Sequence, residues 1–450
     1  MIIKIFIIIS IRKTIFLEKL RMLETKKIKS ITSVRKFYFL DYFYILLLSV
    51  DRFWKMEEIF ESFKILKQLY QLGESKYKKL TSESMPTKKQ LDRYRYTLEQ
   101  VIEEAKEYYL ISEEKNGKLE LTKSGIDLLK IAETKGNREF NLEIFRLMEN
   151  QYEAFKYIIN FAYEANKHKP GLLIFPNYSP SQMGIARKSI KCKDDIIQYL
   201  NSLVQRLEYD LEKFIGRRPN LVSHTNKIVN RLENSELLGK NKKDIFNPRD
   251  YNKIIKRIRD YWLAVFLKDI YHYEFSASSF DFWIYRGKQI GIIQVSEFFP
   301  NFSGRIVYPT SIISEKVNDP DFESLYEYDN GQSLFVHSLM EHQNDEKFVD
   351  TLVKYYFDLR KSYRGYFINL LALRELVCYS LKISDYVFEK LLNEVYKLNI
   401  LGKLKIKISL EVDRLPEETK AIYLKREPVI VDGQVRNIIG IDVTKGGRKR

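Results

Sequence analysis

The clearest pattern of apolar and polar positions lies between residues 109 and 130. Two short runs in which apolar and polar residues alternate flank Asn116-Gly117, a dipeptide that suits the positive φ angles of a tight hairpin turn. The second run continues through Thr122 into a helical pattern that includes Ile126. The pattern therefore predicts a β-hairpin that leads directly into a helix.

Helical patterns lie on both sides of this hairpin. Residues 56–72 carry an apolar stripe at helical spacing, with acidic residues in the first turn and Gly73 after the last. A second helix is predicted to begin at Thr87 and to lead into the hairpin, and a third covers residues 141–166. Residues 167–171 (KHKPG) break the pattern and mark the first domain boundary.

The middle of the chain repeats this order of elements. Helices are predicted between residues 194 and 271, with glycines after two of them. The runs FDFWIYR and QIGIIQVSEF then flank Gly287-Lys288. Because both runs are rich in aromatic and β-branched residues, they predict a second hairpin.

The C-terminal part shows the order once more. Two helices are predicted between residues 346 and 381, and Ser384 is a candidate N-cap of the next helix. Strict alternation over residues 404–412 indicates a half-buried strand, and Asp432-Gly433 marks a further hairpin.

This repeated order resembles that of tandem winged-helix DNA-binding proteins and, more loosely, the specificity domains of type IIS restriction enzymes. The resemblance covers hairpins such as EEKNGKLELT and the helix before each one. It implies an α+β, helix-dominated fold of tandem winged-helix modules with small β-hairpin wings. The expected domains are an N-terminal extension (1–55), a first module with a trailing helix (56–170), a basic central module (171–344) and a C-terminal module with a basic tail (345–450).

The extension contains two apolar runs, and neither suits a membrane span. The first is short, and the second, residues 37–50, contains Asp41 and is shorter than the roughly 20 residues that a spanning helix needs. We therefore expect no stable membrane insertion. One hypothesis is that residues 1–55 are an over-extended start and that the native protein begins at Met56. If these residues are translated, a peripheral membrane anchor is the leading alternative.

The net charge of +16 is concentrated in two stretches. Residues 1–55 carry twelve Lys/Arg against four Asp/Glu, and residues 181–270 carry nineteen against eleven, so each stretch is +8. A basic segment within an otherwise neutral fold is what a phosphate-binding surface requires. A solvated, lysine-rich surface without a ligand is the alternative interpretation.

The candidate DNA-binding residues follow from this charge and from the expected modules. In a winged-helix module the helix before the wing enters the major groove, and the hairpin tip reaches a minor groove or the phosphates. Arginines rank above lysines because they can bind phosphate or guanine through two parallel hydrogen bonds. The candidates are Lys88, Lys89, Arg93, Arg95, Lys115, Arg217, Arg218, Lys253, Lys256, Arg257, Arg259, Arg286 and Lys288.

The sequence predicts no catalytic, cofactor or metal site. Cys192 and Cys378 have no Cys or His at ligand spacing, and no phosphate-binding glycine loop occurs. A restriction-type nuclease needs a carboxylate and a lysine two residues apart on a strand. The strand predicted around Gln294 lacks that triplet.

We therefore expect a cytoplasmic protein that binds double-stranded DNA. It would act as a regulator or as the recognition subunit of a genome-defence or restriction-type assembly, with a helicase or nuclease as partner. The C-terminal module, whose last helix is nearly neutral, would support docking or a homodimer. The rivals are a protein-interaction scaffold built of winged-helix modules and a metal-dependent nuclease with an unrecognised site.

Overall fold

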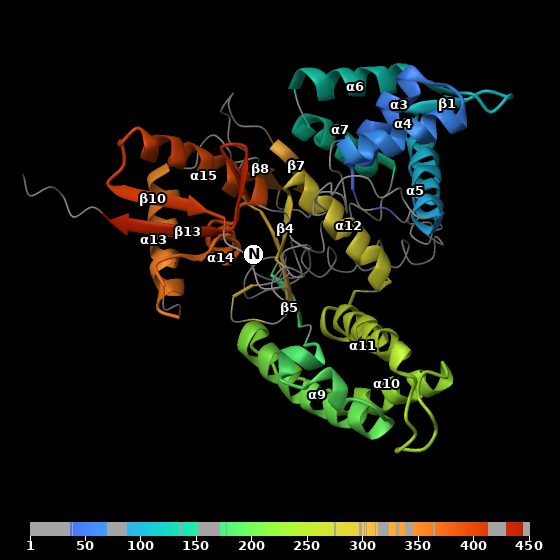
Figure 1. Ribbon diagram of the computed structural model, residues 1–450, viewed down its shortest axis with the longest axis vertical. Coiled ribbons are helices and arrows are strands. Elements are labelled where there is room, and N and C mark those ends of the chain that lie inside the picture. Colours follow the sequence, from blue (N-terminus) through green and yellow to red (C-terminus); the bar gives the residue numbers. More distant parts are fainter. Residues whose placement is uncertain are drawn as a thin grey trace, which may run out of the picture. The chain divides into compact units, whose positions relative to one another are not determined.

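Helices dominate the fold, and small antiparallel sheets accompany them (Figure 1). The computed structural model describes residues 37, 39–69, 88–135, 137–151, 172–176, 178–273, 276–296, 299–300, 302, 304–310, 312–313, 324–329, 333–337, 345–362, 365–412 and 429–443. The chain divides into two compact units. Unit 1 comprises residues 1–64, 86–158 and 281–283, and unit 2 comprises residues 65–85, 159–280 and 284–450.

Unit 1 consists of helices around one hairpin. Its elements are α3 (Asp41–Arg52), α4 (Met56–Leu69), α5 (Lys88–Glu107), β1 (Ile111–Glu113), β2 (Leu119–Leu121), α6 (Lys123–Lys135) and α7 (Asn137–Gln151). The last residues of α4 belong to unit 2. Residues 152–171, which include most of the predicted trailing helix and the predicted boundary, lie outside the described residues.

Helix α3 lies within the stretch that the sequence interpretation left outside the modules. It packs against α5, α6 and β2, and its Phe43 ring lies 5.6 Å from the ring of Tyr108. Phe43, Ile45 and Leu46 are fully buried. The short apolar run of residues 37–50 is therefore the inner face of a core helix, and residues 41–52 are part of the fold of unit 1.

The first hairpin and the helix after it are confirmed. The backbone N–H of Glu114 donates to the carbonyl of Lys118 (2.9 Å), and Gly117 has a φ of 79°. The loop therefore has three residues with glycine in the left-handed position, rather than a two-residue turn. Gly125 leaves room for the carbonyl of Leu110, which an added Cβ would overlap.

Unit 2 begins with a buried sheet and a group of helices. The sheet has the antiparallel order β3-β5-β4, and every residue of its three strands is buried. The strands are β3 (Leu173–Pro176), β4 (Ile293–Ser296) and β5 (Gly304–Pro309). The helices are α9 (Lys193–Ile215), α10 (Val222–Asn234), α11 (Tyr251–Val265) and α12 (Ala277–Ile290), and Phe266–Ile270 form a π-helical turn after α11.

The hairpin predicted around Gly287-Lys288 is wrong. Residues 277–290 form α12, and β4 pairs with β5 instead of with residues 280–286. The Ser276 side chain caps the helix by accepting from the N–H of Ser279, and Gly291 ends it with a φ of 88°. Most of the long side chains of α12 are buried, and the half-buried ones, Asp281, Tyr285, Lys288 and Gln289, lie on one side of the helix. Its sequence looks like a hairpin because its aromatic and β-branched residues also favour strands and flank Gly287-Lys288.

The C-terminal part of unit 2 has the predicted helices, strand and hairpin in the predicted order, together with two further strands that the sequence did not predict. Its elements are α13 (Asp345–Arg360), β9 (Ile368–Asn369), α14 (Leu370–Leu381), α15 (Asp385–Ile400), β10 (Ile406–Glu411), β11 (Val429–Val431), β12 (Gln434–Arg436) and β13 (Ile438–Val443). The order β10-β13-β9 forms one sheet, and β11 and β12 form a hairpin. Asp432 and Gly433 both have positive φ (52° and 69°), as a type I′ turn requires. A further sheet, β6-β8-β7, contains β6 (Ile312–Ile313), β7 (Ser324–Asp329) and β8 (Ser333–His337).

Candidate nucleic-acid interface

Helices α9, α10 and α11 lie side by side in unit 2 and carry the largest set of candidate residues (Figure 1). We call them the α9–α11 bundle. Helix α11 buries Ile254, Ile258, Trp262 and Val265 on one side. Because the helix repeats every 3.6 residues, residues 253, 256 and 260 lie on the opposite side, and residues 257 and 259 lie on its two flanks. Hydrophobic burial therefore fixes which side of α11 faces solvent.

The outward side of α11 and its flanks present Lys253, Lys256, Arg257 and Arg259, all of which are exposed. Lys253 forms an ion pair with Asp250 (2.6 Å). Among the described residues, no carboxylate lies within 4.0 Å of the cationic groups of Lys256, Arg257 and Arg259. These three cations are available to a ligand, and we call them the α11 cations.

Arg217 and Arg218, by contrast, bind groups of the protein itself. The guanidinium of Arg217 donates to the carbonyl of Ile270, at the end of the π-helical turn. Arg218 lies 3.7 Å from Glu208 and 3.5 Å from Glu212 on α9. Arg217 thus joins the C-terminal end of α9 to the segment after α11, whereas the carboxylates of α9 partly neutralise Arg218.

In unit 1 the candidate cations are on the N-terminal half of α5. Lys88 and Arg93 are exposed, and the guanidinium of Arg95 lies 4.8 Å above the ring of Phe60. The side chain of Lys89 lies outside the described residues. The outward side of the C-terminal half is acidic, with Glu99 and Glu103 exposed.

The first hairpin carries little positive charge. Residues 111–121 contain Lys115 and Lys118 against three glutamates, so their net charge is −1. Lys115 is exposed near the tip, whereas Lys118 pairs with Glu120 (2.8 Å) and lies 5.0 Å above the ring of Trp54. Of these two lysines, only Lys115 remains a candidate for the contact expected of a hairpin tip.

Arg286 and Lys288 are not on a hairpin tip, and that prediction is wrong because both lie on α12. Arg286 is fully buried. The ammonium of Lys288 pairs with Asp385 (2.9 Å), and both side chains are largely buried. These two cations therefore belong to the interior of the fold rather than to a DNA-binding surface.

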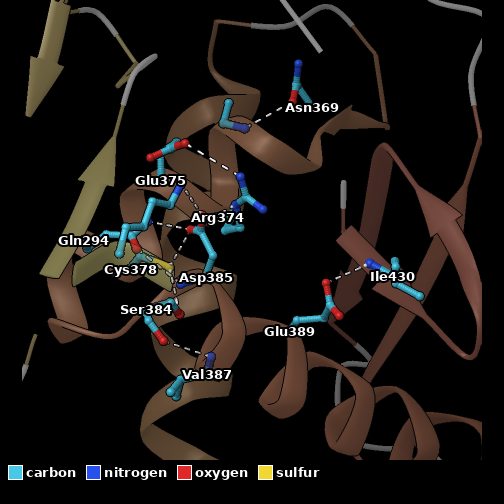
Figure 2. A network of polar contacts seen from close by, with 12 residues as sticks. Gln294, Asn369, Arg374, Glu375, Cys378, Ser384, Asp385, Val387, Glu389 and Ile430 are labelled. Carbon is cyan, nitrogen blue, oxygen red and sulfur yellow. Dashed lines mark hydrogen bonds and ion pairs between the residues drawn. The ribbon is translucent and has the colours of Figure 1, made fainter. Parts of the chain in front are cut away.

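Asp385 is the centre of a buried polar network that joins β4, α12, α14 and α15 (Figure 2). Its carboxylate lies 3.3 Å from the guanidinium of Arg374 and accepts a hydrogen bond from the side chain of Gln294 (2.5 Å). Burial alone would raise the pKa of Asp385, but the charges of Arg374 and Lys288 outweigh it and hold that pKa below its usual value. The network stabilises the contact between the central sheet and the C-terminal helices.

A second polar chain lies within the α9–α11 bundle. The Tyr261 hydroxyl and His224 Nδ1 are 2.9 Å apart, and His224 Nε2 lies 3.6 Å from Asp269. Burial, helped by the charge of Lys227, lowers the pKa of His224, and burial raises the pKa of Tyr261. These contacts link α10 to α11 and to the turn after α11.

The described residues contain no group of three His, Cys, Asp or Glu side chains close enough to hold a metal ion. None of the helices that the structure describes is both long enough and apolar enough to cross a membrane. Comparison of the chain with protein-family models, curated proteins and solved structures gave no match. The inference of function therefore depends on this chain's own residues.

Several cations that lie between the predicted helices are not among the candidates from the sequence. Arg187, Lys188 and Lys191 precede α9, and Lys240, Lys242 and Lys243 precede α11. The charge count of residues 181–270 included them, but about fifty residues separate the two groups. Only the fold shows that the two segments touch.

Proposed function

We propose that this protein binds double-stranded DNA, as a regulator or as the recognition subunit of a larger assembly. The observation that carries the proposal is the set of α11 cations. Lys256, Arg257 and Arg259 are exposed and have no carboxylate within 4.0 Å among the described residues. Unneutralised cations repel one another, and the phosphates of a duplex remove that repulsion while releasing counterions.

The order of elements supports the proposal independently of charge. In unit 1, helices α3, α4 and α5 precede the hairpin β1–β2. The C-terminal part has α13, β9, α14, α15, β10, a hairpin and β13. Both orders resemble that of winged-helix modules. On that resemblance the N-terminal half of α5, with Lys88 and Arg93, would approach the groove, and the α11 cations would hold the phosphates.

A protein-docking function is the second candidate, and a specific observation favours it. Large apolar side chains are exposed in the C-terminal part of unit 2, among them Ile400 (64%), Leu401 (65%) and Val412 (65%). The net charge of −1 on the first hairpin also fits docking better than DNA contact. The two functions are compatible if the C-terminal part binds a partner or a second copy while the α9–α11 bundle holds DNA.

A mobility-shift experiment with the full chain separates the two candidates. We expect a complex with duplex DNA of about 30 base pairs at about 150 mM salt, since phosphate contacts give nonspecific affinities of roughly micromolar order or weaker. A complex that survives a change of base sequence would support phosphate anchoring. Absence of any complex at about 50 mM salt would contradict the proposal and leave docking as the function.

A further inference from the structure

Two basic segments that are distant in the sequence are held together at the N-terminal ends of α9 and α11. Cys192 and Ile245 form an isolated β-bridge, and the N–H of Phe246 donates to the carbonyl of Lys191 (3.1 Å). The N–H of Asp194 donates to the carbonyl of Lys242 (3.0 Å). Backbone hydrogen bonds therefore fix residues 191–194 against residues 242–246.

These two joined segments and the residues next to them carry seven exposed cations, which we call the basic corner. They are Arg187, Lys188, Lys191, Lys240, Lys242, Lys243 and Arg249. Within the part of the chain that the structure describes, no carboxylate lies within 4.0 Å of any of these cationic groups. The guanidinium of Arg187 lies 4.7 Å above the ring of Tyr251, a contact that orients the group without neutralising it.

Several nearby carboxylates already form hydrogen bonds or ion pairs with other groups of the protein. Asp195 accepts hydrogen bonds from the backbone N–H of Lys191 and of Cys192, and these bonds, with the charge of Lys191, lower the pKa of Asp195. Asp244 accepts from the N–H of Asn241 (3.0 Å), and Glu233 pairs with Lys193. Residues 187–195 and 240–250 together contain eight Lys/Arg against four Asp/Glu, a net charge of +4.

The basic corner is continuous with the cations of α11. Arg249 lies two residues before α11, and Lys253, Lys256 and Arg257 follow on its exposed surface. Eight residues separate Arg249 from Arg257, which is about 12 Å of helix at 1.5 Å per residue. That length matches roughly three to four successive phosphates of one strand, at about 3.4 Å of axis each.

We infer that the basic corner is the main phosphate anchor for duplex DNA and contacts the backbone of one strand next to the α11 cations. The inference rests on the proposed function and identifies the part of the surface that supplies most of the affinity. Five of the seven residues are flexible, strongly hydrated lysines, which suit phosphate rather than base edges. The corner therefore binds without base preference, and any sequence reading comes from elsewhere.

The test compares two triple variants of the full chain by fluorescence anisotropy over a range of salt concentrations. The corner variant is Lys191→Gln, Lys242→Gln, Lys243→Gln. The matched control is Lys354→Gln, Lys397→Gln, Lys403→Gln, which removes the same charge from exposed positions of the C-terminal part. The corner variant should bind about tenfold or more weakly at about 150 mM salt and should lower the salt slope by about two to three, near 0.9 per lost contact.

The control variant should match the wild type, and both variants should keep the wild-type unfolding midpoint because all six lysines are exposed. If the wild type binds duplex DNA and both variants bind it more weakly to the same extent, general surface charge holds the DNA and the inference is wrong. If the wild type does not bind duplex DNA at all, the proposed function fails instead. Tighter binding to a double-stranded RNA of the same length would overturn DNA as the partner.

Discussion

The cations of α12 and α14 and those of α11 are the same residue types on the same kind of element, yet they have opposite surroundings. Lys288 and Arg374 are buried and pair with Asp385, whereas Arg257 is exposed, with no carboxylate within 4.0 Å among the described residues. Removing a charge from water is costly unless a partner compensates it, so the buried cations serve the fold. The exposed cations cost little to keep and are free to bind an external anion. The pairing of a cation, not its presence, indicates its role.

The loss of Asp385, the carboxylate shared by the buried cations, should lower stability the most. Asp385→Ala leaves the charges of Arg374 and Lys288 without their shared carboxylate, and we expect the free energy of unfolding to fall by about 3–5 kcal/mol. Urea denaturation of the full chain measures it. The control Asp350→Ala removes an exposed carboxylate of α13 and should change stability by less than about 0.5 kcal/mol. Equal effects of the two substitutions would show that the network contributes nothing.

Asp210 is the opposite case to Asp385, because it is a buried carboxylate whose nearest cation is more distant. It is 2% exposed, and its nearest cation is Arg206 at 3.9 Å. Burial raises its pKa to about 6, although the charge of Lys213 acts in the opposite direction. A folded-state pKa above the unfolded value of about 3.9 means that protonation stabilises the fold. That stability is complete below about pH 4 and is lost as the pH rises through about 6.

Asp210→Asn should therefore remove a pH dependence. Between about pH 4 and pH 7 the wild type should lose about 2–3 kcal/mol from this group, and the variant should not. The difference between their unfolding free energies, measured across that range, isolates the contribution of Asp210. Parallel curves would show that its pKa is not raised.

The double variant Arg257→Ala, Arg259→Ala tests the role of the exposed cations of α11. Loss of two phosphate contacts should flatten the salt slope of DNA binding by about two, and affinity should fall for every duplex sequence. Stability should stay within about 0.5 kcal/mol because both side chains are exposed. Arg217→Ala serves as the contrast, since its guanidinium donates to Ile270. Arg217→Ala should lower the free energy of unfolding by more than it weakens the free energy of DNA binding.

The smallest expected effect concerns the helix that presents Asp385. The Ser384 hydroxyl accepts from the N–H of Val387 and caps α15. Ser384→Ala should lower the free energy of unfolding by about 1 kcal/mol. Thermal unfolding measures the change, and Ser384→Asp, which keeps a capping oxygen, should recover part of it. A larger loss in the Asp variant would mean that the site tolerates no added charge beside Asp385.

Local signals in the sequence predicted much of the fold. Ser384 as a cap, Gly216 after α9 and the Asp432-Gly433 turn each act within a few residues, so a sequence window contains the whole cause. The sequence of α12 resembles a hairpin because its aromatic and β-branched residues also favour strands and flank a Gly-Lys pair, whereas the fold buries most of them in a helix.

The residues of the site were harder to predict than the fold, because their role depends on burial and on tertiary contacts. The sequence shows that Arg257 and Arg286 are both arginines on apolar segments, but not that Arg286 is buried. It also does not show that Lys191 meets Lys242, because that contact depends on a β-bridge between residues more than fifty positions apart. Whether a charge is neutralised, and which other charges lie near it, depends on tertiary contacts that no local sequence pattern contains.

The most direct test of the central claim is the salt dependence of wild-type binding to two duplexes of unrelated sequence. If the unpaired cations of the α9–α11 bundle hold phosphates, log K should fall linearly with log salt, with a slope steeper than about −4 for both duplexes. A slope near zero, or no binding at about 50 mM salt, would contradict the claim.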